Sequence, residues 1–334
     1  MRVVVVGATG NVGSSLLEAL AHEPLVESVL GISRRPPEHE QGTLDWARAD
    51  IGRDELLPHF RGADCVVHLA WQIQPSHDPN RLWLTNVRGS ERVLRAAAAA
   101  GVPALVYASS VGAYSPGPKD RRVDETWPTD GVRSSFYARH KAKTERMLDV
   151  LERERPELRV VRLRPGLIFK REAAWWVKQL FMGPFVPSPL VRRSLVPVVP
   201  DLPRLRFQAV HSRDVGEAYR LAIVGDVCGP FNVAAEPVLD PPELARLLRA
   251  RTISVPPKML RALTAATWRL RLQPTPPGWL DLALGVPLMD TTRARQELRW
   301  EPRHGSGDAL LELMRGIRDR AGAPEPPLVG SGRH

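Results

Sequence analysis

Cysteine and long apolar runs are scarce in this sequence, and their scarcity excludes several classes of protein. The 334 residues include only two cysteines, Cys65 and Cys228, which form neither a disulfide framework nor the spacing of a metal site. We therefore expect no bound metal and a reducing compartment. No stretch approaches the ~20 apolar residues of a membrane helix, and the valines that follow Met1 and Arg2 are too few for the core of a signal peptide. The expectation is a cytoplasmic protein with no membrane partner.

Lysine is also rare, although the chain is strongly basic. The 47 Lys and Arg residues outnumber 37 Asp and Glu residues, which gives a net charge of +10, yet only six of the 47 are lysines. The arginines are spread along the whole chain, and the densest pairs are Arg34-Arg35 and Arg192-Arg193. A nucleic-acid-binding protein concentrates such charge in a patch or an arm. We expect no nucleic-acid partner, and we expect some arginines to bind an anionic small molecule.

Strand and helix patterns alternate in the first half of the chain. Short β-branched and apolar runs indicate buried strands, and longer polar-apolar segments that end at Gly or Pro indicate helices. This order predicts an α/β fold with a doubly wound parallel sheet covered by helices on both faces. We expect strands at 2–6, 29–33, 65–70, 104–109 and 159–163, and helices at 14–22, 54–60, 86–101 and 137–154.

After Pro165 the pattern loosens and prolines cluster. Residues 206–211 resemble a strand and 214–224 a helix, and we expect both to return to the parallel sheet. The remaining C-terminal segments should pack over the carboxyl ends of the strands as a smaller lid. The expected division is a nucleotide-binding domain of residues 1–165 plus 205–235, a substrate-binding lid of 166–204 plus 236–321, and a disordered tail of 322–334.

Three glycines follow the first expected strand and open the first helix. Gly7, Gly10 and Gly13 have the spacing G-x-x-G-x-x-G within VVVVGATGNVG. In a dinucleotide-binding turn, the first permits a tight turn, the second lets the backbone approach a pyrophosphate, and the third lets the helix pack closely. The helix N-terminus then presents free N–H groups to the phosphates. The pattern predicts a dinucleotide cofactor.

The residues at the end of the second expected strand indicate whether the cofactor is NAD or NADP. A cofactor with a free ribose 2′-hydroxyl usually meets an acidic residue there, but this chain has Ser33, Arg34 and Arg35. A hydroxyl and two guanidinium groups suit a 2′-phosphate, because Arg binds phosphate bidentately. We expect NADP in preference to NAD.

A tyrosine and a lysine lie four residues apart on the helix expected at 137–154. Tyr137 and Lys141 therefore share one helix face, one turn apart. A phenol with a pKa near ~10 exchanges protons at neutral pH only if a nearby cation stabilises its anion. Ser109 and Ser110 lie at the carboxyl end of the strand expected at 104–109, at the edge of the sheet where ligands bind. A serine there can hold a substrate oxygen against the phenol.

These motifs together resemble the extended short-chain dehydrogenases/reductases, usually called the NAD-dependent epimerase/dehydratase family. That family has a Rossmann-type sheet with a smaller C-terminal substrate-binding part. The matching segments fall in the family's order: GATGNVG at 7–13, Asp50, HLA at 68–70, NVRGS at 86–90, YASS at 107–110, YARHK at 137–141, RLRPG at 162–166, HSRDV at 211–215, FNVA at 231–234 and MDTTRARQELRWEPR at 289–303.

The resemblance implies specific roles for the site residues. Ser110 matches the active-site serine, with Ser109 as the alternative, Tyr137 is the acid/base, and Lys141 is its partner. Asn86 either supports a proton relay or caps a helix. The implied cofactor contacts, beyond Ser33, Arg34, Arg35, Tyr137 and Lys141, are Gly7, Thr9, Gly10, Asn11, Val12, Gly13, Asp50 and Ile51 at the adenine, Leu69, Ala70 and Pro165.

The substrate is implied less clearly, because the chain departs from the family's nucleotide-sugar members. Those members commonly have an Asn where this chain has Leu167, and sugar dehydratases have an Asp-Glu pair where it has Val111-Gly112. Trp175 and Trp176 suggest a partly apolar pocket, with packing inside the lid as the alternative. We expect an oxidoreductase acting on a small carbonyl or alcohol. The alternatives are a nucleotide-sugar epimerase with tightly held NAD and a non-catalytic NADP-sensing regulator. By analogy with the family, a homodimer would form through the helices at 86–100 and 137–154.

Overall fold

The computed structural model describes residues 1–37, 43–73, 78–181, 188, 191, 196–323 and 328. Its centre is a seven-stranded sheet in the order β11-β7-β5-β4-β1-β2-β3, and every neighbouring pair of strands is parallel. This confirms the doubly wound parallel fold. The strands are β1 (Arg2–Val6), β2 (Ser28–Ser33), β3 (Leu44–Arg48), β4 (Cys65–His68), β5 (Ala104–Ala108), β7 (Arg159–Pro165) and β11 (Gly229–Val233).

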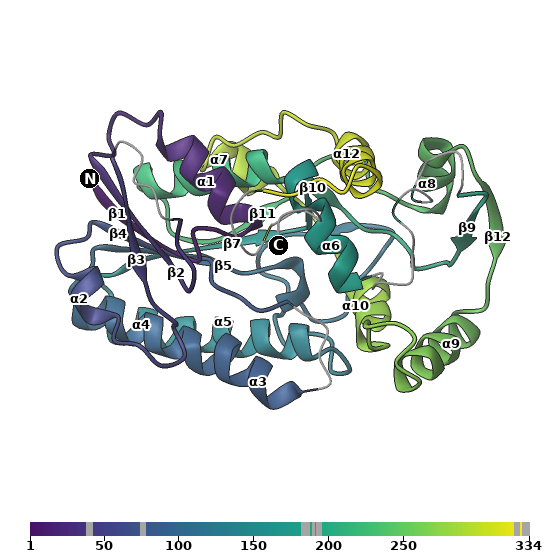
Figure 1. Cartoon of the computed structure of the whole chain (residues 1–334), viewed down its shortest axis with the longest axis horizontal. Helices are drawn as coiled ribbons and strands as arrows, with labels where there is room; N and C mark the ends of the chain where they lie inside the picture. The colour runs from purple at the N-terminus through teal and green to yellow at the C-terminus, as the bar shows by residue number, and fades with distance from the viewer. Residues whose placement is uncertain are drawn as a thin grey trace.

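Helices cover both faces of this sheet (Figure 1). Val3 and Val5 of β1 pack against α1 (Asn11–Leu20) and α7 (Ser212–Val224) on one face. Val4 and Val6 pack on the other face, in the same core as residues of α2 (Leu57–Phe60), α4 (Gly89–Ala99) and α5 (Phe136–Glu154). Because both faces are buried, β1 is a continuous valine run rather than an alternating strand.

The strand expected at 206–211 does not join the main sheet. The observed β10 (Ala209–His211) pairs instead with β8 (Leu167–Phe169) in a separate two-stranded parallel sheet. The position beside β7 is taken by β11, which pairs with β7 over five residues and buries Phe231 and Val233. The expectation was wrong because β10 and β11 are both short and apolar, so the sequence does not say which of them pairs with β7. β11 forms the longer pairing, over five residues.

One helix start also differs from expectation. The edge strand β3, whose half-exposed sequence carries Asp45 and Arg48, lies just before Asp50, where a short strand was expected. The helix expected from residue 86 begins earlier, with α3 (Pro79–Trp83), where the Asp78 carboxylate accepts from the N–H of Arg81 at 3.1 Å. A π-helical turn, Leu84–Arg88, connects α3 to α4.

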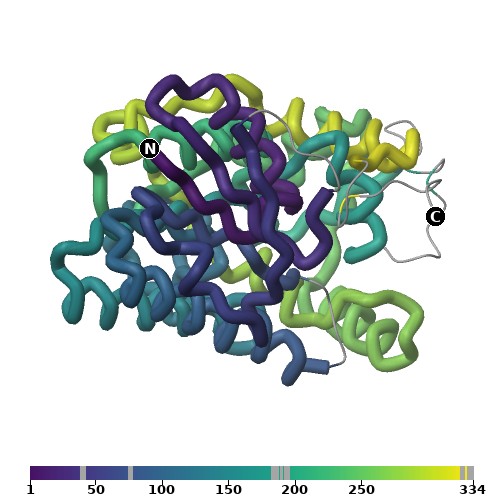
Figure 2. The backbone as a smooth tube through the Cα atoms, turned by 60° about the vertical axis from the view of Figure 1, so that its left-hand side comes forward, coloured from purple at the N-terminus to yellow at the C-terminus, as the bar shows by residue number. Residues whose placement is uncertain are grey.

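Residues 198–201 and 241–285 lie beyond one end of the sheet (Figures 1 and 2), whereas Ala294, Leu298 and Trp300 pack in the main core. The expected domain division stays a prediction, and most of the expected disordered tail lies outside the described residues. None of the helices in the described part of the chain has the length and apolar character needed to cross a bilayer. The remaining helices and strands are β6 (Arg122–Val123), α6 (Ala174–Phe181), β9 (Val198–Asp201), α8 (Pro241–Leu248), β12 (Arg251–Ser254), α9 (Pro257–Arg269), α10 (Gly278–Gly285), β13 (Leu288–Met289), α11 (Thr292–Gln296) and α12 (Ser306–Arg318).

Candidate active site

Two glycines in the turn between β1 and α1 are required by close backbone contacts. Gly7 has a φ of +91°, and a Cβ atom there would lie 2.6 Å from the backbone nitrogen of Ala70. A Cβ atom on Gly13 would lie 2.4 Å from the carbonyl oxygen of Ala8. Any larger residue at either position would displace backbone. The turn therefore forms the close-packed cradle that the sequence predicts before α1.

A groove of about 130 Å³ opens beside this cradle. It brings together most of the residues expected to bind the cofactor, from the ends of β1, β2 and β4. Asn11, Val12 and Gly13 begin α1 next to it. Four other expected cofactor contacts are not among the lining residues: Arg35, Tyr137, Lys141 and Pro165. The groove is lined by Val6, Gly7, Thr9, Gly10, Ile32, Ser33, Arg34, Ala49, Asp50, Ile51, Leu69, Ala70, Trp71, Gln72 and Thr85.

One buried polar atom in the groove fits a bound ligand. The Ser33 hydroxyl is buried and has no hydrogen-bond partner among the described residues. An unsatisfied buried hydroxyl costs about 1–3 kcal/mol, so a ligand that pairs with it stabilises the site. Arg34 is exposed at the same place. Together with the glycine cradle, these residues fit a dinucleotide.

The structure places Ser110, rather than Ser109, against Tyr137. The Ser110 hydroxyl accepts from the backbone N–H of Gly112 at 3.0 Å. A Cβ atom on Gly112 would lie 3.4 Å from the Ser110 Oγ and 2.8 Å from Cε1 of Tyr137, so the hydroxyl and the phenol ring lie beside each other. The Ser109 hydroxyl instead donates to Glu145 at 2.5 Å. Of the two serines considered from sequence, Ser110 is therefore the one beside the phenol.

Lys141 is buried beside the end of β5 and is covered by an aromatic ring. Its ammonium donates to the carbonyl oxygen of Ala108 and lies 3.6 Å from the ring centroid of Trp71, compared with 5.9 Å from that of Tyr137. Trp71 also lines the groove, so it connects the cofactor site to the Tyr137-Lys141 pair. A cation over the face of an indole is favourable.

Burial shifts the two pKa values in opposite directions. Desolvation raises the pKa of Tyr137 to about 12, although the neighbouring Ser110 side chain opposes this rise. Desolvation also lowers the pKa of Lys141 well below its usual value, and the charge of Glu145 partly opposes this effect. Each group is driven toward its neutral form because an isolated charge is costly in a dry site.

Aromatic side chains form a wall beside Tyr137. Trp279 of α10 lies 5.1 Å from the Tyr137 ring, centroid to centroid, and Trp71 lies 6.1 Å away, edge on. The two tryptophans expected to bind substrate lie in α6, and both are half-buried. Trp175 packs against Lys178 at 4.8 Å. A substrate role for Trp175 and Trp176 stays a prediction.

Asn86 holds the loop after β4. It lies fully buried in the π-helical turn, where its amide oxygen accepts from the backbone N–H of Gln72 at 2.7 Å. Its amide nitrogen donates to the Gln72 carbonyl at 2.9 Å. Neither contact caps a helix. Because Gln72 lines the groove, Asn86 positions one wall of the cofactor site.

Glu145 is the residue that sequence reasoning missed. Its carboxylate is fully buried on α5, one turn beyond Lys141, and it accepts from Arg164 at two 3.0 Å contacts and from Arg162 at 2.8 Å. Burial opposes ionisation, but the two guanidinium groups hold the pKa of Glu145 at about 2. The spacing to Tyr137 and Lys141, at i+8 and i+4 on the same helix face, was the available signal.

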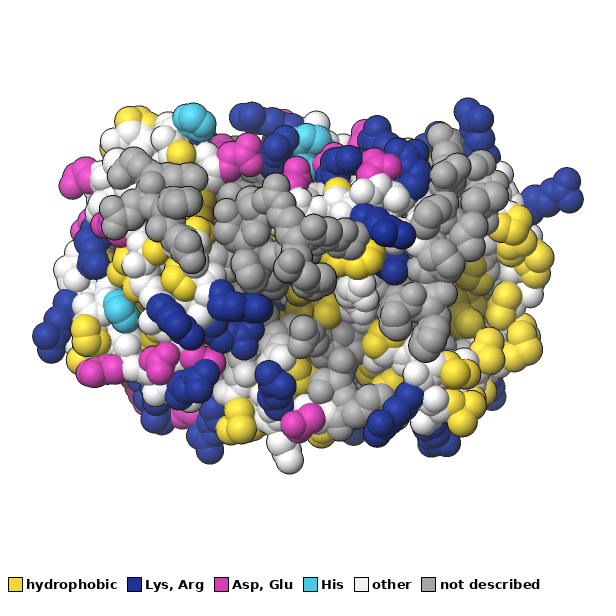
Figure 3. Space-filling view, in the orientation of Figure 1, with side chains coloured by type: hydrophobic (Ala, Val, Ile, Leu, Met, Phe, Trp, Pro, Cys, Tyr) yellow, Lys and Arg dark blue, Asp and Glu magenta, His cyan; other side chains and the backbone are white. Residues whose placement is uncertain are grey.

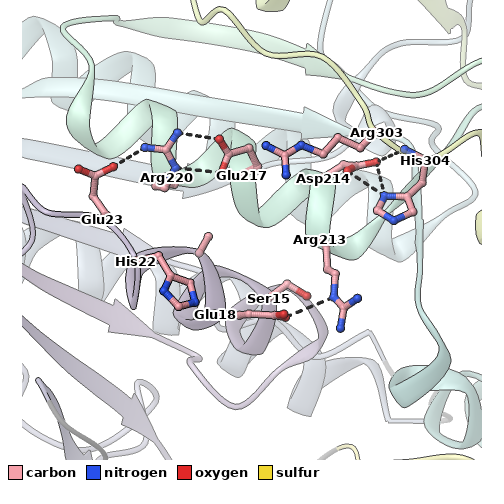
Figure 4. A pocket seen from close by; sticks show the side chains of 11 residues that line it. Ser15, Glu18, His22, Glu23, Arg213, Asp214, Glu217, Arg220, Arg303 and His304 are labelled. Carbon is pink, nitrogen blue, oxygen red and sulfur yellow. Dashed lines mark hydrogen bonds and ion pairs between the residues drawn. The ribbon is translucent and has the colours of Figure 1, made fainter.

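A larger groove lies elsewhere, between α1 and α7 (Figure 4). This groove of about 630 Å³ is lined mainly by charged side chains. Its four carboxylates are already paired, and Tyr137 does not line it. We therefore locate the chemistry in the smaller groove. The pairs are Glu18 with Arg213, Glu23 and Glu217 with Arg220, and Asp214 with His304.

Comparisons with known proteins agree with this geometry. The model of the NAD dependent epimerase/dehydratase family matches residues 3–173. An uncharacterized protein of Mycobacterium tuberculosis is 27% identical over 326 residues, and the match spans 96% of this chain but 31% of that relative's length. A putative dihydroflavonol 4-reductase of Synechocystis is 29% identical over 153 residues, which cover 42% of this chain and 43% of that protein.

A solved structure extends the likeness in fold to most of the chain. UDP-glucose 4-epimerase of Thermus thermophilus, in complex with NAD, has a TM-score of 0.70 and 22% identity. The superposition covers 95% of this chain and 99% of that chain. At this level of identity the likeness shows a shared fold.

We expect Glu145→Gln to destabilise the protein, because it removes the carboxylate partner of the buried Arg164. Arg162 also loses this carboxylate but keeps its ion pairs with Asp149 and Glu152. Removing one partner of a buried ion pair costs about 3–5 kcal/mol of the free energy of unfolding, measurable by urea denaturation at pH 7. The depressed pKa of Glu145 means that its contribution is complete above the ordinary value of 4.5 and is lost as the pH falls toward about 2. The difference from wild type should therefore narrow in acid.

Glu157→Gln is the matched control. Glu157 forms an exposed 3.7 Å pair with Arg155, and such pairs contribute less than about 1 kcal/mol. Equal stability of Glu145→Gln and Glu157→Gln at pH 7 would contradict the role of Glu145.

Proposed function

Because the chain belongs to the NAD-dependent epimerase/dehydratase family, we propose that it is an NAD(P)-dependent oxidoreductase acting on a small carbonyl or alcohol substrate. The observation that carries this proposal is the placement of the Ser110 hydroxyl and the Tyr137 ring side by side at Gly112, next to the buried Lys141. Trp71 joins these residues to the groove with the glycine cradle. A proton-exchanging group thus lies next to a site that fits a dinucleotide.

In the proposed reaction, Ser110 holds the substrate oxygen and Tyr137 exchanges a proton with it. Lys141 stabilises the phenolate of Tyr137 by its positive charge. A nicotinamide cofactor, when bound in the groove, supplies or accepts the hydride. Trp279 packs on the phenol ring and keeps bulk water from it.

We assign cofactor binding to the groove and to the residues that begin α1. The glycine cradle and the N-terminus of α1 would hold the pyrophosphate, and Asp50 with Ile51 would hold the adenine. Asn86 acts on this site by positioning Gln72. The full proposed set is Gly7, Thr9, Gly10, Asn11, Val12, Gly13, Ser33, Arg34, Arg35, Asp50, Ile51, Leu69, Ala70, Tyr137, Lys141 and Pro165.

Within this proposal, NADP is preferred to NAD. The last residue of β2 is Ser33, whose buried hydroxyl has no partner among the described residues, and Arg34 follows it in the groove lining. No carboxylate occupies this strand end, where NAD-binding proteins place one on the ribose 2′-hydroxyl. The Thermus thermophilus structure contains NAD, so NAD is the competing cofactor in any measurement.

The second candidate function is that of a nucleotide-sugar epimerase, which the shared fold with UDP-glucose 4-epimerase favours. Leu167 weighs against it, because its side chain is 45% exposed and offers no hydrogen bond to a sugar nucleotide. The wall formed by Trp71 and Trp279 favours a less polar substrate.

A regulator that only senses NADP would need neither Tyr137 nor Lys141. A homodimer through α4 and α5 and a cytoplasmic location stay predictions.

We expect Tyr137→Phe to abolish most turnover while leaving the fold and cofactor binding intact, because it removes only the phenol oxygen. Loss of a general acid/base lowers the rate by about 10²–10⁴-fold. Nicotinamide absorbance during reduction of a panel of carbonyl compounds measures this change. Net consumption of NADPH also separates the oxidoreductase from an epimerase, which returns the hydride and leaves the absorbance unchanged.

Tyr219→Phe makes the same chemical change in the core under α7, and should keep turnover. Near-normal turnover of purified Tyr137→Phe would show that Tyr137 is not the general acid/base of the reaction.

The double variant Arg34→Ala/Arg35→Ala tests the cofactor assignment. We expect NADP affinity to fall by about 1.5–3 kcal/mol for each charged hydrogen bond lost, with NAD affinity nearly unchanged. Equilibrium titration of cofactor fluorescence measures both, and Arg155→Ala, on the exposed end of α5, is the control. An equal loss for NAD and NADP would refute binding of the 2′-phosphate by these arginines.

A further inference from the structure

An exposed apolar stripe runs along α9. Met259, Leu263, Ala266 and Leu270 recur at i, i+4, i+7 and i+11, which places them on one side of the helix. Met259, Leu263 and Leu270 are 59%, 60% and 69% exposed. The other side of α9 carries the half-buried Leu260, which is turned toward the protein. α9 is therefore apolar on the side that faces solvent.

The stripe is part of a larger apolar surface at this end of the molecule. Ile253 of β12 and Leu272 after α9 are each more than half exposed. Figure 3 shows hydrophobic side chains gathered at the right-hand end, over the elements that Figure 1 labels β12 and α9. Exposed apolar patches of this kind mark interaction surfaces rather than ordinary solvent-facing surface.

The charge around the stripe has one sign. Between Glu243 and Asp281 the sequence has no acidic residue and seven basic ones. Two of the seven are paired, Arg246 with Glu243 and Arg261 with Asp281. The others form no ion pair with any described residue. They are Arg249, Arg251, Lys258, Arg269 and Arg271.

We propose that α9 and its flanks dock this protein on an anionic membrane surface, with the stripe in the interfacial region and the basic residues on lipid phosphates. A convex helix with exposed Met and Leu and flanking Lys and Arg has the chemistry of an interfacial helix. Lys258 and Arg269 can bury their stems beside the stripe and extend their charges to the headgroups. Docking of this kind needs no spanning segment, so it is compatible with the lack of a bilayer-crossing helix in the described part of the chain. It departs from the expectation of no membrane partner, and the two can be distinguished by experiment.

A second copy of the chain is a poorer occupant. A two-fold symmetric contact brings the same patch together with itself. It would set Lys258, Arg269 and Arg271 against the same unpaired cations of the other copy. A nucleic acid would satisfy the basic residues but would leave the apolar stripe against a hydrophilic backbone.

Co-sedimentation of the full chain with lipid vesicles tests the proposal. Vesicles of phosphatidylcholine with phosphatidylglycerol should bind the protein, and vesicles of phosphatidylcholine alone should bind it much less. Binding should weaken as salt rises, because screening acts on exposed charges. Lys258→Gln/Arg269→Gln/Arg271→Gln and Leu263→Ser/Leu270→Ser should each lower the affinity for anionic vesicles by about tenfold or more.

Two control variants show whether the surface is specific. Leu25→Ser removes an equally exposed leucine far from α9, and Arg153→Gln/Arg155→Gln removes exposed charge from the end of α5. Both should bind like the wild type, and thermal unfolding should show that all variants are folded. Absence of binding to anionic vesicles, or binding that the α9 variants leave unchanged, would overturn the proposal. So would a wild-type dimer that Leu263→Ser/Leu270→Ser dissociates.

Discussion

The buried carboxylate of Glu145 is the contact on which the arrangement of the site depends. It lies on α5 and accepts hydrogen bonds from Arg162 and Arg164 of β7 and from Ser109 at the end of β5. The Glu145 carboxylate thus joins α5, β7 and the end of β5, which carry or adjoin the site. A buried charge of this kind is tolerated only because it is fully paired.

This anchoring decides which groups can face the substrate. With Ser109 engaged by Glu145, the next hydroxyl along the chain is the one beside Tyr137. The half-buried phenol and the buried ammonium of Lys141 then share one site, and desolvation drives both toward the neutral form. Their charges are tolerated only together, because a phenolate and an ammonium stabilise each other in a medium of low polarity. Trp71 adds a face that favours the cation.

The fold up to Pro165 could be predicted from the sequence because strands buried on both faces are continuous apolar runs. The strand at 206–211 was misplaced, since its local pattern does not say which of two short segments has the longer register with β7. The cofactor-binding turn could be predicted because its close backbone contacts require glycine at fixed positions, and these positions can be read from the sequence. The role of Glu145 could not be predicted, because nothing local in the sequence distinguishes Arg162 and Arg164 from surface arginines. Only the folded sheet places them next to α5.

The central claim is that Tyr137 ionises with the help of the cationic groups around it. The chain has only four tyrosines, so tyrosinate absorbance of the wild type minus that of Tyr137→Phe reports this phenol. Without cofactor, Tyr137 should stay protonated beyond the usual pKa of about 10. Saturation with NADP⁺ should lower its pKa well below that value, and Lys141→Met should remove most of the decrease. An unchanged pKa in the presence of NADP⁺ would contradict the account.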